Sequence, residues 1–134
     1  MNRKRQVTMR TKGQIEAEIS EAIVKFEKEY MGRGPQETKT YIIDDLVLVR
    51  LKGIMTQAEY QLAGMDDNPR GRELIKQVRH ELLERGRPLL EAMIHDLTGR
   101  KTLSLHTDIS IVTGERMILF TLDAAPELPP HEAG

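Results

Sequence analysis

The residues that could do chemistry are few and lie far apart in the sequence. The segment Gly32-Arg33-Gly34-Pro35 places one guanidinium between two glycines, and such a loop can present a fork of donors to an anion. It equally suits a structural turn, in which Pro35 stiffens the chain and Arg33 pairs with a neighbour. We keep both interpretations. The binding hypothesis is a site for a small anion or nucleotide, with Arg100 or Arg116 near Arg33.

A second polar group has the spacing of a strand. Ser104, His106 and Asp108 occupy alternate positions, so a strand places them on one side. Side chains at this spacing lie about 6.6 Å apart along the strand, too far for a nucleophile, base and acid to act as a triad. We therefore expect no catalytic residues. His106 and Asp108 are interpreted as polar groups on an open sheet face that contact a ligand or partner.

Metal and cofactor sites have no recognisable pattern. The four histidines show no metal-ligand spacing with one another or with a carboxylate, and cysteine is absent. Glycine loops of the phosphate-binding and dinucleotide-binding types are missing as well. We expect neither a metal nor a cofactor, and we expect the protein not to be an enzyme.

Composition predicts one globular domain with an aliphatic core. The chain has 134 residues, of which 39% are hydrophobic and 31% charged, and it contains no Trp. Its 20 Lys and Arg against 21 Asp and Glu give a net charge of -1, which argues against a nucleic-acid partner. No apolar run approaches the roughly 20 residues that cross a bilayer, and no secretory signal is visible, so we expect a cytoplasmic protein.

The two ends of the chain are predicted to be flexible. Residues 1–10 form a basic arm, with no acidic residue before Glu16, and the arm is expected to make weak contact with anionic lipid. Residues 124–134 are rich in proline and show no periodic pattern, so a disordered tail is expected there. The single domain is assigned to residues 11–123.

The first half of the domain has the pattern of a helix followed by a hairpin. Thr11 and Gln14 match a capping box, and Gly32 is suited to end the helix that starts there. Along this helix the apolar stripe is Ile15, Ile19, Ala22, Ile23, Phe26 and Tyr30, and charged residues, Glu27 among them, are expected on the solvated side. Segments 38–43 and 46–51 read as two strands joined at Asp44-Asp45.

The second half repeats this order after a short helix that begins at a capping box, Thr56 to Glu59. A long helix is predicted from Asn68-Pro69 almost to Gly99, with a kink or division at Gly86-Arg87-Pro88. Segments 101–112 and 116–122 then form a second hairpin. Two α-β-β units predict an α+β two-layer sandwich, in which a four-stranded antiparallel sheet has helices on one face.

One strand of this sheet is apolar on both sides. Leu46-Val47-Leu48-Val49 offers apolar side chains to each face, whereas a single layer of helices covers only one. The uncovered face predicts contact between two copies of the chain, and hence a homodimer.

In this order, the first helix, the Gly32-Arg33-Gly34-Pro35 loop, the linker from Leu51 to Glu59 and the segment from Leu103 to Asp108 resemble a bacterial family of small YbcI-like proteins. That family was formerly a domain of unknown function and is now labelled the MpsC component of a Na+-translocating, membrane-potential-generating system. The resemblance extends over residues 11 to 123.

The resemblance implies an accessory role beside a membrane complex. The other known components of that system are integral membrane proteins linked to cation movement and inorganic-carbon uptake. A soluble accessory or regulatory protein that docks on such subunits is therefore expected, in the cytoplasm or peripherally at the inner face of the membrane. The resemblance carries no catalytic or ligand-binding residues over to this chain. The alternative function is the anion or nucleotide sensor described above.

Overall fold

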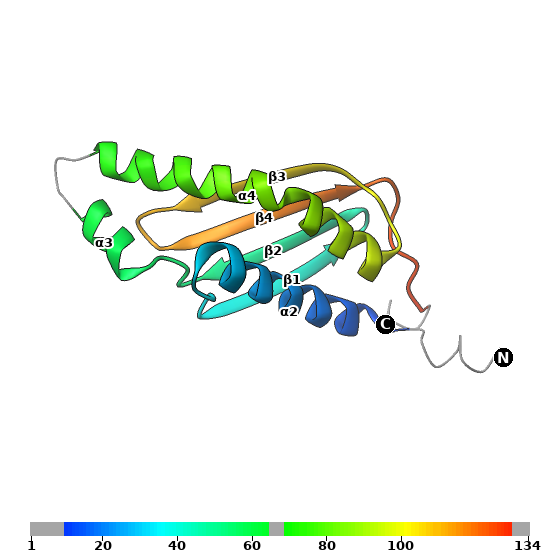
Figure 1. Cartoon of the computed structure of the whole chain (residues 1–134). Helices are drawn as coiled ribbons and strands as arrows, with labels where there is room; N and C mark the ends of the chain where they lie inside the picture. Colours follow the sequence, from blue (N-terminus) through cyan, green and yellow to red (C-terminus); the bar gives the residue numbers. More distant parts are fainter. Residues whose placement is uncertain (1–9, 65–68, 130–134) are drawn as a thin grey trace.

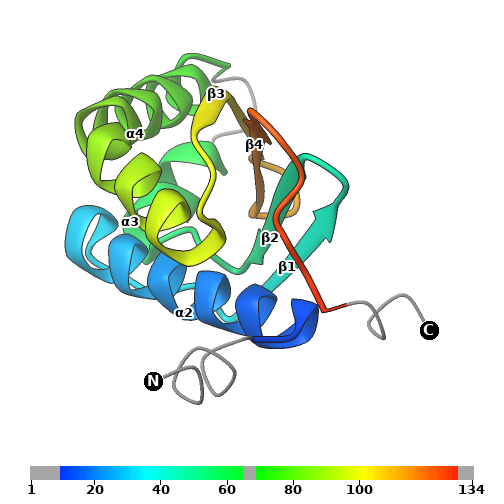
Figure 2. The same cartoon turned by 90° about the vertical axis from the view of Figure 1, so that its right-hand side faces the viewer.

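The computed structural model describes residues 10–64 and 69–129, and these form a layer of helices over an antiparallel sheet (Figure 1). The elements in chain order are α2 (Lys12–Met31), β1 (Glu37–Ile43), β2 (Leu46–Lys52), α3 (Gln57–Ala63), α4 (Pro69–Thr98), β3 (Thr102–Ser110) and β4 (Glu115–Leu122). Helices α2 and α4 lie on the same face of the sheet (Figure 2). The predicted α+β two-layer fold is confirmed.

The sheet places the two α-β-β units side by side. Its four strands are in the order β1-β2-β4-β3, and every neighbouring pair is antiparallel. The second strand of each unit therefore lies at the centre, and the first strand lies at an edge. Helices α2 and α4, each preceding its own hairpin, run in opposite directions across the sheet (Figure 1). This arrangement is the one that two similar units give when they are related by a two-fold rotation.

Local signals fix where the helices begin and end. The Thr11 and Thr56 hydroxyls accept hydrogen bonds from the backbone three residues later, and the side chains of Gln14 and Glu59 accept from the two threonine N–H groups. Both predicted capping boxes are thus confirmed. Helix α2 ends at Gly32, whose φ of 81° lies in the left-handed region that favours glycine.

Helix α4 differs from its prediction in one respect. It continues from Pro69 to Thr98 with Pro88 inside it, so of the predicted kink or division at Gly86-Arg87-Pro88 the division is wrong. A proline in a helix removes one backbone hydrogen bond, and packing on both sides of that position can offset the loss. Asn68, the predicted cap, lies outside the described residues.

The core lies between the helices and one face of the sheet. Burial along β2 and β4 alternates strictly between buried and half-buried side chains. The core is largely aliphatic, as its composition predicts, and its most fully buried members include Ile23, Phe26, Val47, Val49, Leu83, Leu90, Ile118 and Phe120. The outward side chains of the same strands are only half covered.

Residues 124–129 form neither helix nor strand, yet they contact the domain. Pro126 and Pro129 are buried, and Leu128 packs against the core. Arg100 Nε donates to the carbonyl oxygen of Ala125 at 2.9 Å. The rest of the predicted tail, residues 130–134, and residues 1–9 of the predicted basic arm lie outside the described residues.

Candidate functional site

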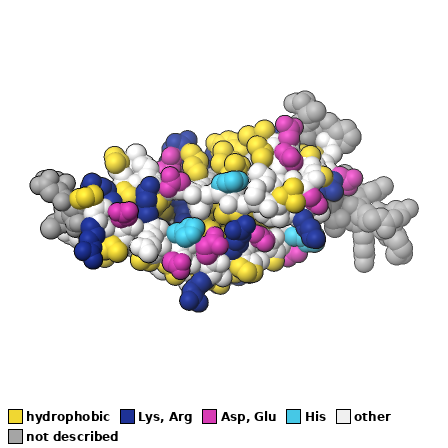
Figure 3. All heavy atoms as spheres, turned by 90° about the horizontal axis from the view of Figure 1, so that it is seen from above, with side chains coloured by type: hydrophobic (Ala, Val, Ile, Leu, Met, Phe, Trp, Pro, Cys, Tyr) yellow, Lys and Arg dark blue, Asp and Glu magenta, His cyan; other side chains and the backbone are white. Residues whose placement is uncertain are grey.

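The outer face of the sheet carries an apolar surface that the helices leave open. We call it the sheet-face patch, and its members are Tyr41, Ile43, Leu46, Leu48, Met117 and Leu119. Leu48 pairs with Tyr41 on one side and with Leu119 on the other, so the patch is continuous across three strands. Ile43 is 50% exposed and Tyr41 38% exposed. From above, hydrophobic side chains gather along the margin where this face begins (Figure 3).

Charges around the sheet-face patch are divided between the two hairpins. The outward side chains of β1 and β2 include the cations Lys39, Arg50 and Lys52 and the carboxylate of Glu37. The turn between the two strands adds Asp44 and Asp45. The second hairpin supplies carboxylates at Glu115 and Asp108. Arg50 Nε lies 2.5 Å from Glu115 Oε2, which links the two halves within one chain. At the outward positions of the strands themselves, the first hairpin therefore carries mainly cations, whereas the second carries carboxylates.

Behind the sheet, charged side chains meet inside the core. We call Glu27, Glu59, Arg79 and Arg116 the buried ion cluster. Arg79 donates from Nε and Nη2 to the two carboxylate oxygens of Glu59 at 2.7 and 2.6 Å, and from Nη2 to the Ile54 carbonyl at 3.0 Å. Arg116 donates to Thr107 Oγ1 at 3.2 Å and to the Arg79 carbonyl at 3.5 Å. The cluster thereby ties α3, α4, β3 and β4 together.

Glu27 completes this cluster from α2 and is wholly buried. Its carboxylate lies 3.9 Å from Arg79 Nη1 and 3.7 Å from Arg116 Nη1, which are ion-pair distances but too long for hydrogen bonds. In the described structure both Glu27 oxygens and both of these nitrogens lack a hydrogen-bond partner. The charges compensate one another, yet their hydrogen-bonding capacity is incompletely used.

Burial and pairing shift the ionisation of this cluster in opposite directions. Loss of solvation raises the pKa of Glu27, against the attraction of Arg116 and Arg79. Burial would also raise the pKa of Glu59, but hydrogen bonds from Arg79 and Thr56 outweigh it and lower that pKa. Burial lowers the pKa of Arg116. The two carboxylates therefore differ: Glu59 is firmly ionised, whereas Glu27 is pushed toward its neutral form.

A cavity of about 190 Å³ opens beside this cluster, between α4 and the second hairpin. Its polar lining comprises Lys76, Arg79, His80, Thr107, Asp108 and Arg116. Lys76 Nζ lies 3.3 Å from Asp108 Oδ1, and the Asp108 side chain is 82% exposed. A hydrogen bond from the Ile109 N–H lowers the pKa of Asp108, so this carboxylate is charged. The cavity thus joins an exposed rim to two buried guanidinium groups.

The arginine of the predicted anion loop makes one contact with the backbone in the structure. Arg33 Nη1 donates to the Met55 carbonyl at 3.0 Å, next to the Ile54 carbonyl that Arg79 holds. The two arginines therefore fix the linker between β2 and α3. Gly32 caps α2, and Gly34-Pro35 leads from there to β1.

The structure does not bring the predicted site residues together. Arg33 follows the end of α2 and Arg100 follows the end of α4, and these helices end at opposite ends of the molecule (Figure 1). Arg116 and Asp108 do share a site, since both line the cavity. His106 is exposed and pairs with Leu119 at the border of the sheet-face patch.

The possible triad residues also have other partners. Ser104 shares a hydrogen bond with Thr121, and Asp108 pairs with Lys76. Among the described residues, no three His, Asp or Glu side chains are placed to hold a metal ion.

Sequence reasoning missed Glu27, Glu59 and Arg79. Glu27 was expected in solvent, whereas it is buried. A signal existed, because Glu27 lies four residues after Ile23 and Arg79 lies midway between Ile75 and Leu83, all of them buried. Arg116 likewise occupies the first of the buried, alternating positions of β4. A charged residue on the apolar stripe of three separate elements is typical of an internal ion cluster.

Comparisons with known proteins agree on one family. The family model described as "Na+-translocating membrane potential-generating system (MpsC)" matches residues 11–124. "Uncharacterized protein YbcI" of Bacillus subtilis (strain 168) is 47% identical over 113 residues, which cover 84% of this chain and 89% of that protein. No solved structure matches the chain. Within the described residues, none of the helices combines the length and apolarity that a membrane crossing requires.

Proposed function

The chain belongs to the MpsC family, and from this premise we propose that it is an accessory or regulatory protein of a Na+-translocating system, acting by protein–protein docking. The observation that carries the proposal is the sheet-face patch, an apolar surface left open by the helices. The family description names a membrane-potential-generating system and no reaction. In this proposal the protein acts at the cytoplasmic face of the membrane, beside integral membrane subunits.

The occupant of the sheet-face patch is a second copy of the chain. Consider a two-fold axis in the plane of the interface and parallel to the strands. It places the first hairpin of one copy over the second hairpin of the other. Lys39 then faces Asp108 of the other copy, and Leu48 faces Leu119. Because Lys39 and Asp108 carry opposite charges and Leu48 and Leu119 are apolar, this pairing is complementary in charge as well as apolar at its centre.

The size of this face predicts a reversible dimer. Four strands about 4.8 Å apart and about seven residues long give an outer face of roughly 19 by 24 Å. Specific interfaces commonly bury about 800 Å² per partner, and this face of roughly 460 Å² lies below that size, among weak and transient contacts. We expect an equilibrium between monomer and dimer that depends on protein concentration.

Replacing Leu48 at the centre of the patch tests the proposal. Leu48→Glu is expected to raise the dimer dissociation constant at least about tenfold, because the symmetry introduces a carboxylate twice into an apolar contact. Sedimentation equilibrium over a range of concentrations measures it. The matched control is Val112→Glu, which changes a side chain that is 90% exposed in the turn before β4 and should leave the constant unchanged.

The same variants test the functional role. In cells lacking the native chain, wild type and Val112→Glu should restore the sodium-dependent membrane potential, whereas Leu48→Glu should not. A wild type that sediments only as a monomer at high concentration would contradict the dimer. An unchanged membrane potential after removal of the chain would contradict the accessory role.

A further inference from the structure

The wall of the cavity beside the buried ion cluster contains the guanidinium group of Arg116, whose hydrogen-bond donors are incompletely used. Arg116 is 2% exposed, and its guanidinium donates only to Thr107 Oγ1 and, at 3.5 Å, to the Arg79 carbonyl. In the described structure no carboxylate hydrogen-bonds to it, and its Nη1, although 3.7 Å from Glu27 Oε2, has no hydrogen-bond partner. A guanidinium carries five N–H donors, and leaving several of them unmet inside a protein is costly. An acceptor in the adjoining cavity would relieve this cost.

The charges around the cavity favour an anion as that acceptor. Lys76 at the rim and Arg116 in the wall are cations, and Arg79 adds a third. The opposing carboxylates are Asp108 at the rim, Glu59 bound to Arg79, and Glu27 behind both arginines. Neither glutamate lines the cavity, so the charged side chains of the lining are three cations, Lys76, Arg79 and Arg116, against the single carboxylate of Asp108.

The volume limits the size of the ligand. A cavity of about 190 Å³ holds about six waters, at about 30 Å³ each. That space admits one small oxyanion with a few waters, whereas drug-sized ligands occupy pockets of about 300–1,000 Å³. The cavity can therefore enclose one phosphate group but not a whole nucleotide. Planar or tetrahedral oxyanions also match the paired donors of a guanidinium.

We propose that this cavity is a binding site for a small oxyanion of the phosphate, sulfate or carboxylate type, held by Arg116 from the wall and by Lys76 from the rim. In the free protein, the Asp108 carboxylate pairs with the Lys76 ammonium group that would bind the anion. When the anion binds, Asp108 turns outward, which its 82% exposed side chain allows. The site shares Asp108 with the proposed dimer contact, but Lys76 and Arg116 lie on the helix side of the sheet. Anion binding by Lys76 and Arg116 can therefore be found even where no dimer forms.

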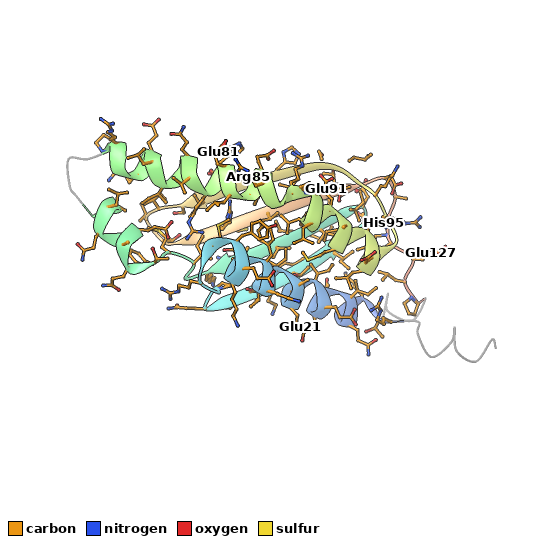
Figure 4. All side chains as sticks on the ribbon, in the orientation of Figure 1. Glu21, Glu81, Arg85, Glu91, His95 and Glu127 are labelled. Atoms are coloured by element: carbon orange, nitrogen blue, oxygen red, sulfur yellow. The ribbon has the colours of Figure 1, made fainter. Side chains whose placement is uncertain are left out.

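Calorimetric titration with inorganic phosphate, sulfate and acetate tests the site, with sodium chloride at equal ionic strength as the reference. Lys76→Ala should weaken binding about tenfold, since it removes a charge-assisted hydrogen bond. Asp108→Asn should strengthen binding several-fold, because it removes the competing carboxylate. Both residues are at the exposed rim, so neither change should prevent folding. Arg85→Ala, which alters an exposed cation of α4 outside the cavity (Figure 4), should leave binding unchanged.

The opposite signs of the two rim variants distinguish a site from general attraction. If the anions were attracted only by the general charge of the surface, Lys76→Ala and Arg85→Ala would weaken anion binding equally. If none of the three anions binds more strongly than chloride, or if Asp108→Asn weakens binding, the proposed site is wrong.

Discussion

Arg79→Met is expected to lower the free energy of unfolding by about 3–5 kcal/mol, the cost of removing one partner from a buried ion pair. Met keeps much of the apolar stem but none of the donors. Glu59 loses both of its hydrogen bonds to Arg79, the Ile54 carbonyl loses its donor, and Glu27 retains only Arg116. Each of these groups would be left in or near the core without its partner.

Urea denaturation of the two proteins measures this loss. Arg85→Met is the matched control, because it makes the same change on the same helix at an exposed position, and it should shift stability by less than about 0.5 kcal/mol. If Arg79→Met costs less than about 1 kcal/mol, the cluster does not hold the elements together as described.

Gly86→Ala is expected to destabilise the protein by about 2–3 kcal/mol, although alanine is the better helix former. A Cβ at Gly86 would lie 2.3 Å from Cε1 and 2.6 Å from Cζ of Phe26. Phe26 is 1% exposed and stacks on Tyr30 with ring centroids 4.6 Å apart, so the ring has little room to move. The added methyl group must therefore push α4 away from α2.

Gly13→Ala provides the control in helix α2. No atom lies within 4 Å of the position that its Cβ would take, so the change should stabilise the protein by about 0.5 kcal/mol through helix propensity alone. Thermal or chemical unfolding of both variants gives the comparison. Equal stabilisation by the two substitutions would show that α2 and α4 do not approach closely at Gly86.

Local features of the fold could be predicted because their causes are local. The side chains of Thr11 and Gln14 satisfy backbone groups within one turn, and Gly32 supplies a left-handed conformation that few other residues adopt. The alternation along β2 and β4 likewise depends on strand geometry alone. Such patterns are visible before any tertiary contact is known.

The predicted site required contacts between distant segments, and there the sequence was less informative. Arg33 has the pattern of an anion loop, but its acceptor is the Met55 carbonyl, which lies beyond the first hairpin. The length of α4 separates Arg100 from Arg33. Glu27 was placed in solvent because charged residues usually lie there, and only its partners on α4 and β4 explain its burial. Single-element patterns do not contain these partners.

A charge exchange on the outer face of the sheet tests the central claim most directly. Lys39→Glu alone and Asp108→Lys alone should each weaken the dimer several-fold, since each places like charges opposite one another in both copies of the contact. The double variant restores opposite charges across the two-fold axis, and sedimentation equilibrium should show its dissociation constant returning close to that of the wild type. The contrary result is a dissociation constant of the double variant that is raised by the product of the two single effects. In that case Lys39 does not face Asp108 of a second copy, and the sheet-face patch has a different occupant.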